Sequence, residues 1–159
     1  MAEQDNLLQA RSVYNSVCKY LDANGWQYDV NEEQLCIECA ACGEDLPIPI
    51  SIRMYPDRQA MVLISNLPFN ISEDKRIDTA IALCGINTKI YCGSFDYDIV
   101  TGEIYFRMTN SYAQSKLSQE LFDYMVLYSC SRVDEYNDKL LMLAKGVISL
   151  EQLLDSLDS

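Results

Sequence analysis

The sequence predicts an α+β fold, a mostly antiparallel sheet with helices packed on one face, and three observations lead to this prediction. Some segments of the chain repeat their apolar residues with the helical period of about 3.6, and others with the strand period of about two. Polar turn sequences separate neighbouring strands, as they do in hairpins. The resulting order is one helix, four strands, one helix, two strands and two helices. Since the 159 residues contain no linker-like stretch, we expect a single domain over residues 1–159.

The first helix is expected from about Asn6 to about Asn24. Gly25 follows at the position where a left-handed C-terminal cap belongs. The apolar residues of this segment recur at spacings of three and four and form one stripe, which consists of Leu7, Ala10, Tyr14, Val17, Cys18 and Leu21.

Four strands are expected after this helix. Residues 26–30 and 34–41 flank a polar turn. Residues 48–54 alternate between apolar and polar side chains, so one face of the sheet is expected to be buried. Pro49 has no N–H group, which places this strand at an edge or leaves its start unpaired on one side. Residues 60–64 are continuously apolar, as in a strand that is buried on both faces.

The second helix is expected to begin with a cap at Ser72 and to end at Gly85. Its apolar stripe consists of Ile77, Ala80, Ile81 and Cys84. Two strands are expected at residues 88–96 and 103–108. Gly93 then falls in mid-strand, where glycine usually marks a bulge or the close approach of another backbone.

The third helix is expected to begin at a Ser118 cap and to end at Gly146. About 27 helical residues would span roughly 40 Å, which exceeds the diameter of a small domain. The helix therefore either breaks near residues 129–131 or crosses the whole sheet.

A last, leucine-rich helix is expected at residues 149–158, after a core that spans about residues 6–146. Ser149 and Gln152 form a capping box at its start. Its apolar stripe consists of Leu150, Leu153, Leu154 and Leu157. Four leucines are too much apolar surface for a short tail to leave in water. They are expected to pack within the chain, on a second copy or on a client, so they are candidate partner-binding residues and the basis for an expected homodimer.

Tyrosines are the second set of candidate partner-binding residues, since the chain has eleven of them. Tyr91, Tyr97 and Tyr105 are expected on the strand face opposite the apolar one, and tyrosine is enriched in interfaces. Ordinary aromatic residues on a sheet surface are the alternative interpretation.

The chain is acidic, with 24 acidic and 12 basic residues and a formal net charge of −12. Nucleic acids and anionic membranes bind proteins through Lys and Arg, so neither is an expected partner. Residues 1–6 are polar and acidic, unlike a secretory signal, and no apolar run approaches the ~20 residues that span a bilayer. We therefore expect a cytoplasmic protein whose seven cysteines are thiols.

The residues needed for common catalytic sites are missing or scattered. The chain contains no histidine, which excludes Ser-His-Asp and Cys-His nucleophile pairs. Neighbouring carboxylates occur as Glu32/Glu33, Glu44/Asp45, Glu73/Asp74 and Asp134/Glu135. Each pair falls in a turn, at a helix start or on a solvated helix face, so separate acid and base roles are not expected. The sequence predicts a non-enzymatic protein with no catalytic residue and no cofactor.

The segment Cys39-Ala40-Ala41-Cys42-Gly43 has the form of a zinc knuckle, and Cys36 is a candidate third ligand. The candidates for a fourth ligand, none of them at a paired spacing, are Cys18, Cys84, Cys92 and Cys130. In a flat strand Cys36 and Cys39 point to opposite faces. We therefore expect packing thiols and no bound metal. The alternative is a structural zinc or redox module centred on Cys36, Cys39 and Cys42.

Several short segments, spread over about residues 10–150, carry a resemblance to a known family. They are Gly25-Trp26, Leu67-Pro68, Asn87, Gly93-Ser94-Phe95 with Asp98, Gly102-Glu103-Ile104, Leu117-Ser118-Gln119-Glu120 and Asp134-Glu135-Tyr136. In this combination the chain resembles the YbjN-like family of bacterial sensory-transduction regulators. The cysteine cluster at residues 36–42 and the final leucine-rich helix depart from the family pattern.

The resemblance implies a fold similar to that of type III secretion chaperones, which dimerise and hold unfolded segments of client proteins. It therefore implies a protein- or peptide-binding domain that acts as a chaperone or regulatory adaptor. The sequence does not identify the client.

Overall fold

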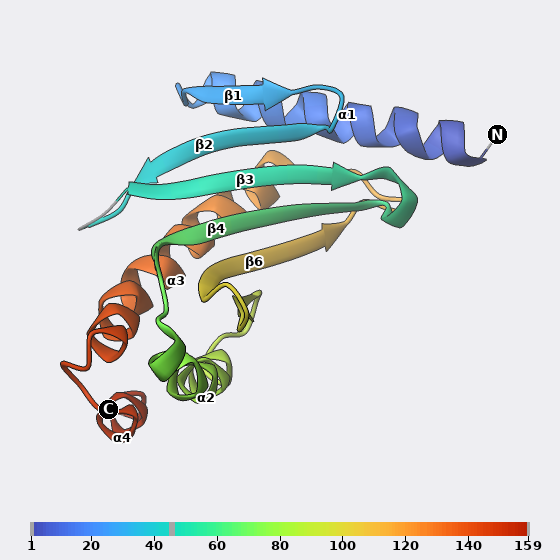
Figure 1. Ribbon diagram of the computed structural model, residues 1–159. Coiled ribbons are helices and arrows are strands. Elements are labelled where there is room, and N and C mark those ends of the chain that lie inside the picture. The colour runs from blue at the N-terminus through green and yellow to red at the C-terminus, as the bar shows by residue number, and fades with distance from the viewer. Residues whose placement is uncertain (1, 45–46, 159) are drawn as a thin grey trace.

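Six β-strands form one antiparallel sheet in the computed structural model, which describes residues 2–44 and 47–158 (Figure 1). The strands are β1 (Tyr28–Asn31), β2 (Cys36–Cys42), β3 (Pro47–Tyr55), β4 (Ala60–Asn70), β5 (Ser94–Asp98) and β6 (Glu103–Ser111). The α-helices are α1 (Ala2–Ala23), α2 (Arg76–Asn87), α3 (Gln119–Ala144) and α4 (Leu150–Asp155). Two short 3₁₀ turns are η1 (Pro56–Arg58) and η2 (Glu73–Lys75). The predicted order of helices and strands is confirmed.

The strands lie in the order β1-β2-β3-β4-β6-β5, and every neighbouring pair is antiparallel. β3 is an interior strand, so its predicted place at an edge is wrong. Pro49 faces Ala40 of β2, whereas pairing with β4 begins only at Ile50. The other predicted alternative is correct: the start of β3 is unpaired on the side of β4, because proline has no N–H to donate.

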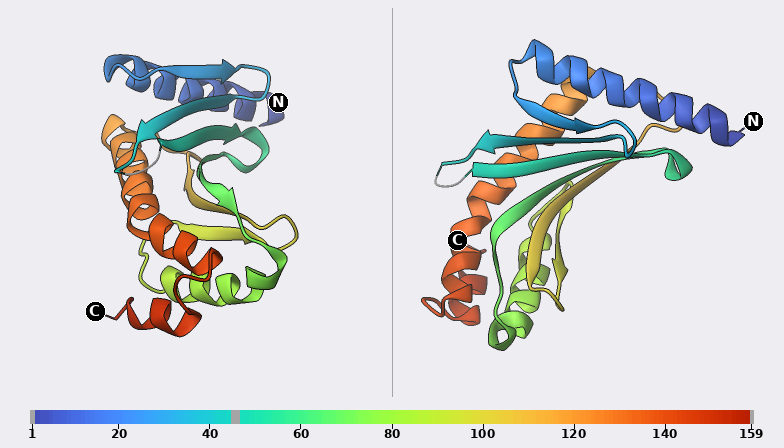
Figure 2. Two further views of the ribbon diagram at one scale, coloured as in Figure 1. Left: turned by 60° about the vertical axis from the view of Figure 1, so that its left-hand side comes forward. Right: turned by 45° about the horizontal axis from the view of Figure 1, so that its top comes forward.

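Helices α1 and α3 lie on one face of the sheet (Figure 1; Figure 2). On the other side, no helix of the described residues covers β2, β3 and β4. We call that side the open face, and the register partners Ser51, Ile64 and Arg107 lie on it. Helices α2 and α4 pack against each other beside the β5 end of the sheet. The helix-covered face therefore holds the core.

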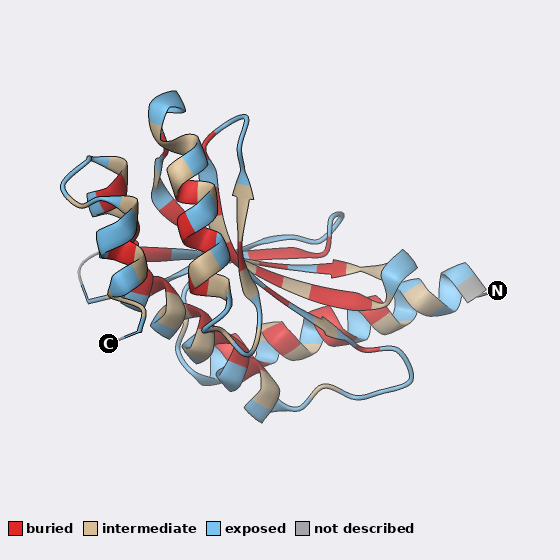
Figure 3. Cartoon of the chain, turned by 90° about the horizontal axis from the view of Figure 1, so that it is seen from below, coloured by how far each residue is buried: buried red, intermediate tan, exposed pale blue. Residues whose placement is uncertain are grey.

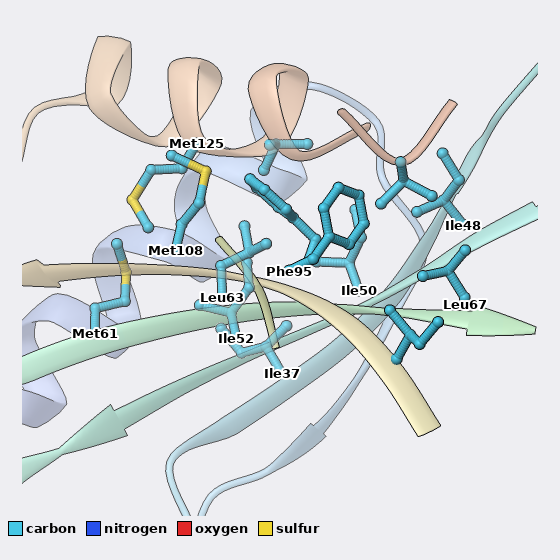
Figure 4. Close-up of a cluster of buried hydrophobic side chains, with 14 of the residues drawn as sticks. Ile37, Ile48, Ile50, Ile52, Met61, Leu63, Leu67, Phe95, Met108 and Met125 are labelled. Atoms are coloured by element: carbon cyan, nitrogen blue, oxygen red, sulfur yellow. The ribbon is translucent and has the colours of Figure 1, made fainter. Parts of the chain in front are cut away.

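The core fills the space between the sheet and α3. Ile52, Leu63 and Met108 are register partners on three adjacent strands, and Figure 4 shows them on the side of the sheet that faces Met125 of α3. All four side chains are buried. Full burial of an apolar side chain of this size is worth about 1.5–3 kcal/mol. Figure 3 shows that the buried residues of the helices lie on their inner sides and that the outer sides are exposed.

The third helix, α3, is continuous over 26 residues, so it does not break near residues 129–131. The Ser118 side chain accepts a hydrogen bond from the Leu121 N–H, so the predicted cap is confirmed. The capping box of Ser149 and Gln152 at the start of α4 is also confirmed. The sequence spacing predicts a buried stripe on α3, and all of its residues but Ala144, which is half-buried, are buried, together with Asn137. The stripe consists of Phe122, Met125, Val126, Ser129, Val133, Tyr136, Leu140, Leu143 and Ala144.

The predicted apolar stripe of α2 is wrong. The structure buries the opposite stripe, which consists of Thr79, Ala82, Leu83 and Ile86. Ile77, Ile81 and Cys84 are exposed instead. Because α2 carries apolar residues on two sides, helical periodicity alone cannot tell which side meets the sheet.

Both predicted ends of α2 also need correction. Ser72 does not cap the helix, because its hydroxyl donates to the carboxylate of Asp74 at 2.6 Å and η2 precedes α2. Gly85 does not end the helix, which continues to Asn87. A Cβ at Gly85 would lie 2.7 Å from Leu154 Cδ2 and 3.3 Å from Leu157 Cδ1. The glycine therefore lets α4 pack closely on α2.

Two strands differ from their predictions. β4 is not buried on both faces, since Val62 and Ile64 are only half-buried on the open face. The reason is that no helix of the described chain covers that side. β5 begins at Ser94 rather than near residue 88, so Gly93 precedes the strand instead of lying within it. The predicted close approach at Gly93 is confirmed, because a Cβ there would lie 2.7 Å from the carbonyl oxygen of Arg107.

Candidate functional site

A groove of about 1010 Å³ lies where the C-terminal half of α1 meets strands β1 and β2. α1 runs alongside β1, with the two segments joined by a short turn (Figure 1; Figure 2). The groove is lined by Tyr14, Asn15, Cys18 and Asp22 of α1, by residues 26–30 and Glu32, and by Glu38, Cys39 and Ala40 of β2.

The turn at the end of α1 builds this groove. The N–H of Gly25 donates to the Asp22 carbonyl at 3.1 Å, and the N–H of Trp26 donates to the Leu21 carbonyl at 3.0 Å. Gly25 has a φ of +70°. These are the two hydrogen bonds and the left-handed residue of a Schellman cap, as predicted for Gly25. The cap reverses the chain, so that Trp26 and Tyr28 return along the side of the helix.

Aromatic residues form part of the groove wall. The Tyr28 hydroxyl donates to Oδ1 of Asp22 at 2.8 Å, and this hydrogen bond is the main reason that the pKa of Tyr28 is raised. Tyr14 is 6% exposed, and its hydroxyl has no hydrogen-bond partner among the described residues beyond the adjacent Cys18 thiol. Burial raises the pKa of both Tyr14 and Cys18. Trp26 is half-buried in the short segment between α1 and β1.

The charge of the groove is entirely negative. Asp22, Asp29, Glu32 and Glu38 line it, and no Lys or Arg is among its lining residues. The ion pairs found within the described ranges join other residues, namely Lys89–Asp158, Arg107–Asp96 and Arg132–Glu135. The four carboxylates are therefore available to a ligand of opposite charge.

One side of the groove is a free sheet edge. Among residues 2–44 and 47–158, β1 pairs only with β2, and its Asp29, Val30 and Asn31 are exposed. β2 continues beyond the residues that pair with β1, so residues 40–42 of β2 have no strand partner on that side. An edge strand presents unpaired backbone N–H and C=O groups, which can pair with a strand from another chain.

The structure does not bring the three candidate tyrosines together. Tyr91 is fully exposed in the segment before β5. Tyr105 is half-buried on the open face, beside a shallow hollow of about 370 Å³ that Pro49, Ser51 and Ile64 help to line. The predicted face of Tyr97 is wrong, because it pairs with the buried Ile104 and its hydroxyl is buried. A partner role for Tyr91, Tyr97 and Tyr105 stays a prediction.

The leucine stripe of α4 packs within the chain. Leu153 is fully buried, and Leu150, Leu154 and Leu157 are half-buried against the core. Packing on α2 and α3 therefore accounts for most of this apolar surface. A partner role for the part of Leu150, Leu154 and Leu157 that stays exposed remains a prediction.

The three clustered cysteines do not converge. Cys36 and Cys42 lie on the open face of β2, and Cys39 points to the helix-covered face, where it neighbours Cys130 of α3. Burial, followed by the Cys130 thiol, raises the pKa of Cys39 to about 11. Within residues 2–44 and 47–158, no group of three or more Cys, Asp or Glu side chains is placed to hold a metal ion. The geometry does not support the zinc or redox module centred on Cys36, Cys39 and Cys42.

The paired carboxylates are spread over separate elements, and Asp45 lies outside the described residues.

None of the helices described here is both long and apolar enough to cross a bilayer.

The sequence pointed to the groove residues only indirectly. Asp22 lies on α1, Glu32 follows β1, and Asp29 and Glu38 are register partners on the open-face side of β1 and β2. Their placement around one groove therefore depends on the reversal at Gly25 and on the strand register. The usable signal was Trp26, the one tryptophan of the chain, placed directly after a glycine cap.

Comparisons with known proteins find one family whose pattern matches residues 14–142, described as "Putative bacterial sensory transduction regulator" (YbjN). No curated protein matches the chain. Two solved structures have the same fold. YbjN of E. coli, a "putative transcription regulator", is 12% identical, with a TM-score of 0.59 over 79% of this chain and 92% of that one. The ExsC–ExsE complex contains a chain that is 12% identical, with a TM-score of 0.56 over 82% of this chain and 95% of that one. The predicted fold class is confirmed.

Proposed function

Because this chain belongs to the YbjN family of bacterial regulators, we propose that it is a regulatory or chaperone-like adaptor that binds a segment of a partner protein in the groove beside β1. The observation that carries the proposal is the coincidence of a large groove with a free sheet edge. Adding a strand to an exposed edge is a common mode of peptide recognition, in which backbone hydrogen bonds give affinity and neighbouring pockets give specificity.

Other observations support a binding role over catalysis. The groove holds carboxylates, thiols and aromatic rings, but its lining offers no pair of nucleophile and base. The similarity to the ExsC–ExsE complex, a complex of two proteins, is consistent with a protein partner. Seven free thiols suit a reducing compartment, so we place the protein in the cytoplasm.

A pull-down with the tagged protein tests the proposal when the wild type is compared with a variant whose groove is blocked. Asn15 is an exposed residue of α1 in the groove lining, and Asn15→Trp would fill the groove without touching the core. Ala113→Trp is the matched control, because Ala113 is exposed in the segment after β6. We expect the wild type and Ala113→Trp to retain the same partner and Asn15→Trp to lose it. Retention by all three chains would show that the partner binds elsewhere.

We also propose that the chain forms a homodimer through the outer side of α2. Ile77 and Ile81 lie one turn apart on this helix and are 63% and 46% exposed, and Cys84 continues the same stripe. An apolar stripe on a helix that is left in water favours packing against another surface. Since α4 packs within the chain, the α2 stripe replaces the leucines as the basis for a dimer.

Light scattering on Ile77→Lys/Ile81→Lys tests the dimer. We expect the double variant to have half the mass of the wild type and an unchanged circular dichroism spectrum. Leu127→Lys, at an exposed position of α3, is the control. A monomeric wild type, or a double variant of unchanged mass, would contradict a dimer through α2.

A further inference from the structure

We propose that the groove beside β1 takes an extended, positively charged segment of its partner, whose backbone pairs with the free edge of β1 and whose Lys or Arg side chains meet the groove carboxylates. This inference rests on the proposed function, because it names the class of partner for the same site.

The charge of the groove is the first reason. Asp22, Asp29, Glu32 and Glu38 line it with no Lys or Arg among the lining residues. Lys19 of α1 is exposed, and it is not one of the residues that line the groove. Asp29 and Glu38 are register partners on the open-face side of β1 and β2, and a cationic ligand along this edge relieves the repulsion between them. A second copy of this chain is a poor occupant, because its formal net charge is −12.

The free backbone edge is the second reason. The outer side of β1 and residues 40–42 of β2 have no strand partner within the described residues. A folded domain or a helix cannot pair with these groups in register, whereas an extended segment can. The charged residues of β1 and of its turn to β2 are all acidic, so the edge itself selects against acidic strands.

Tyr14 supplies an independent reason. Its side chain is 6% exposed and lines the groove, yet its hydroxyl has no hydrogen-bond partner apart from the adjacent Cys18 thiol. A buried hydroxyl without a good acceptor or donor is costly, and a bound polar group removes that cost. Trp26 at the same groove offers a ring face, and indole binds the ammonium of Lys or the guanidinium of Arg.

Trp26 also provides the test, because it is the one tryptophan of the chain and its emission reports directly on the groove. The probes are synthetic peptides of about six to eight residues, the length of a common strand, that alternate Val with Lys, Ser or Glu. We expect the Lys peptide to change the Trp26 emission saturably, the Ser peptide to bind more weakly and the Glu peptide not to bind. Raising the salt concentration from about 0.05 M to about 0.3 M should weaken the binding of the Lys peptide.

A charge-matched pair of variants distinguishes the groove from the general acidity of the protein. Asp29→Asn/Glu32→Gln removes two groove carboxylates, and we expect it to bind the Lys peptide about fivefold more weakly. Glu73→Gln/Asp138→Asn removes two exposed carboxylates of η2 and α3, outside the groove lining, and should bind like the wild type. Circular dichroism checks that both variants are folded. A Lys peptide with N-methyl groups on alternate residues cannot pair with β1 and should not bind.

Three results would overturn the inference, and they bear differently on the proposed function. If the Ser or Glu peptide changes the Trp26 emission at the same concentrations as the Lys peptide, the groove binds peptides without the cationic preference. If both double variants lose the same affinity, the attraction is nonspecific. If calorimetry and Trp26 emission detect no binding of any peptide, extended cationic segments are not ligands, and only the capture experiment then bears on the proposed function.

Discussion

The side chain of Asn87 pairs with the backbone of Phe95 as a neighbouring strand would. Its Nδ2 donates to the Phe95 carbonyl at 3.0 Å, and its Oδ1 accepts from the Phe95 N–H at 2.8 Å. Asn87 is the last residue of α2, and Phe95 is buried in β5, where its ring packs against Phe106 and Tyr136. One amide therefore joins the end of a helix to an edge strand of the sheet and to the aromatic part of the core.

Asn87→Ala should destabilise the fold by about 2–3 kcal/mol, because it leaves the N–H and C=O of Phe95 without partners. Asn87→Asp should also destabilise it, since a carboxylate accepts from the N–H but repels the carbonyl oxygen. Urea unfolding measures both changes. Asn66→Ala, at an exposed position on β4, should stay within about 0.5 kcal/mol of the wild type. Equal effects at Asn87 and Asn66 would contradict the pairing role.

Gly93→Ala should cost more than about 2 kcal/mol. The residue has a φ of +79°, and a Cβ would lie 2.7 Å from the Arg107 carbonyl oxygen and 2.9 Å from Met108 Cγ. Gly25→Ala is the matched control, since its φ is +70° and a Cβ there would meet nothing within 4 Å. It should cost only the backbone strain of about 1 kcal/mol. The urea midpoints of the two variants separate backbone strain from the clash, and equal midpoints would remove the clash from the explanation.

The buried hydrogen bond between Ser65 and Ser129 predicts a strongly non-additive pair of mutations. The two hydroxyls are 2.7 Å apart, and both residues are fully buried between β4 and α3. Either single alanine leaves one hydroxyl unpaired and should cost about 1–2 kcal/mol. The double alanine removes both polar groups and should be at least as stable as either single variant. Additive losses in thermal unfolding would show that the hydroxyls do not depend on each other.

Leu153→Ala should lower the stability by about 2–5 kcal/mol, because its side chain is fully buried where α4 meets the core. Leu127→Ala, at a residue that is 66% exposed on α3, should have almost no effect. Truncation after Gly146 should lower the melting temperature and leave the oligomeric state unchanged, since α4 packs within the chain. A truncated chain that keeps its melting temperature but loses its dimer would contradict this packing.

Features with local causes were predicted correctly from the sequence. The Ser118 cap, the capping box of Ser149 and Gln152, and the Gly25 cap each depend on a few neighbouring residues. The periodicity of α3 also identified its buried side, because its apolar residues at helical spacing form one continuous stripe, whereas exposed apolar residues such as Leu127 do not.

Features that depend on distant contacts were not predicted. On α2, Ile77 and Ile81 compete with Leu83 and Ile86, and only the docking of α4 on Gly85 and of α2 beside β5 decides which pair is buried. Ile64 on β4 is half-buried because no helix in the described part of the chain covers the open face. A local pattern contains neither piece of information.

The candidate groove lies between these two cases. Its glycine cap and Trp26 were visible in the sequence, but the placement of Asp22 and Glu38 around one groove was not. That placement requires the chain reversal at Gly25 and the register that places Tyr28 opposite Cys39.

Hydrogen–deuterium exchange of the chain, with and without the partner isolated by capture, tests the central claim most directly. The account predicts that binding protects the amides of residues 26–31 on the free edge of β1, together with the end of α1, and leaves the open face and α4 unchanged. Protection confined to the open face around Tyr105, or to the outer side of α2, with no change in residues 26–31, would contradict the assignment of the groove as the binding site.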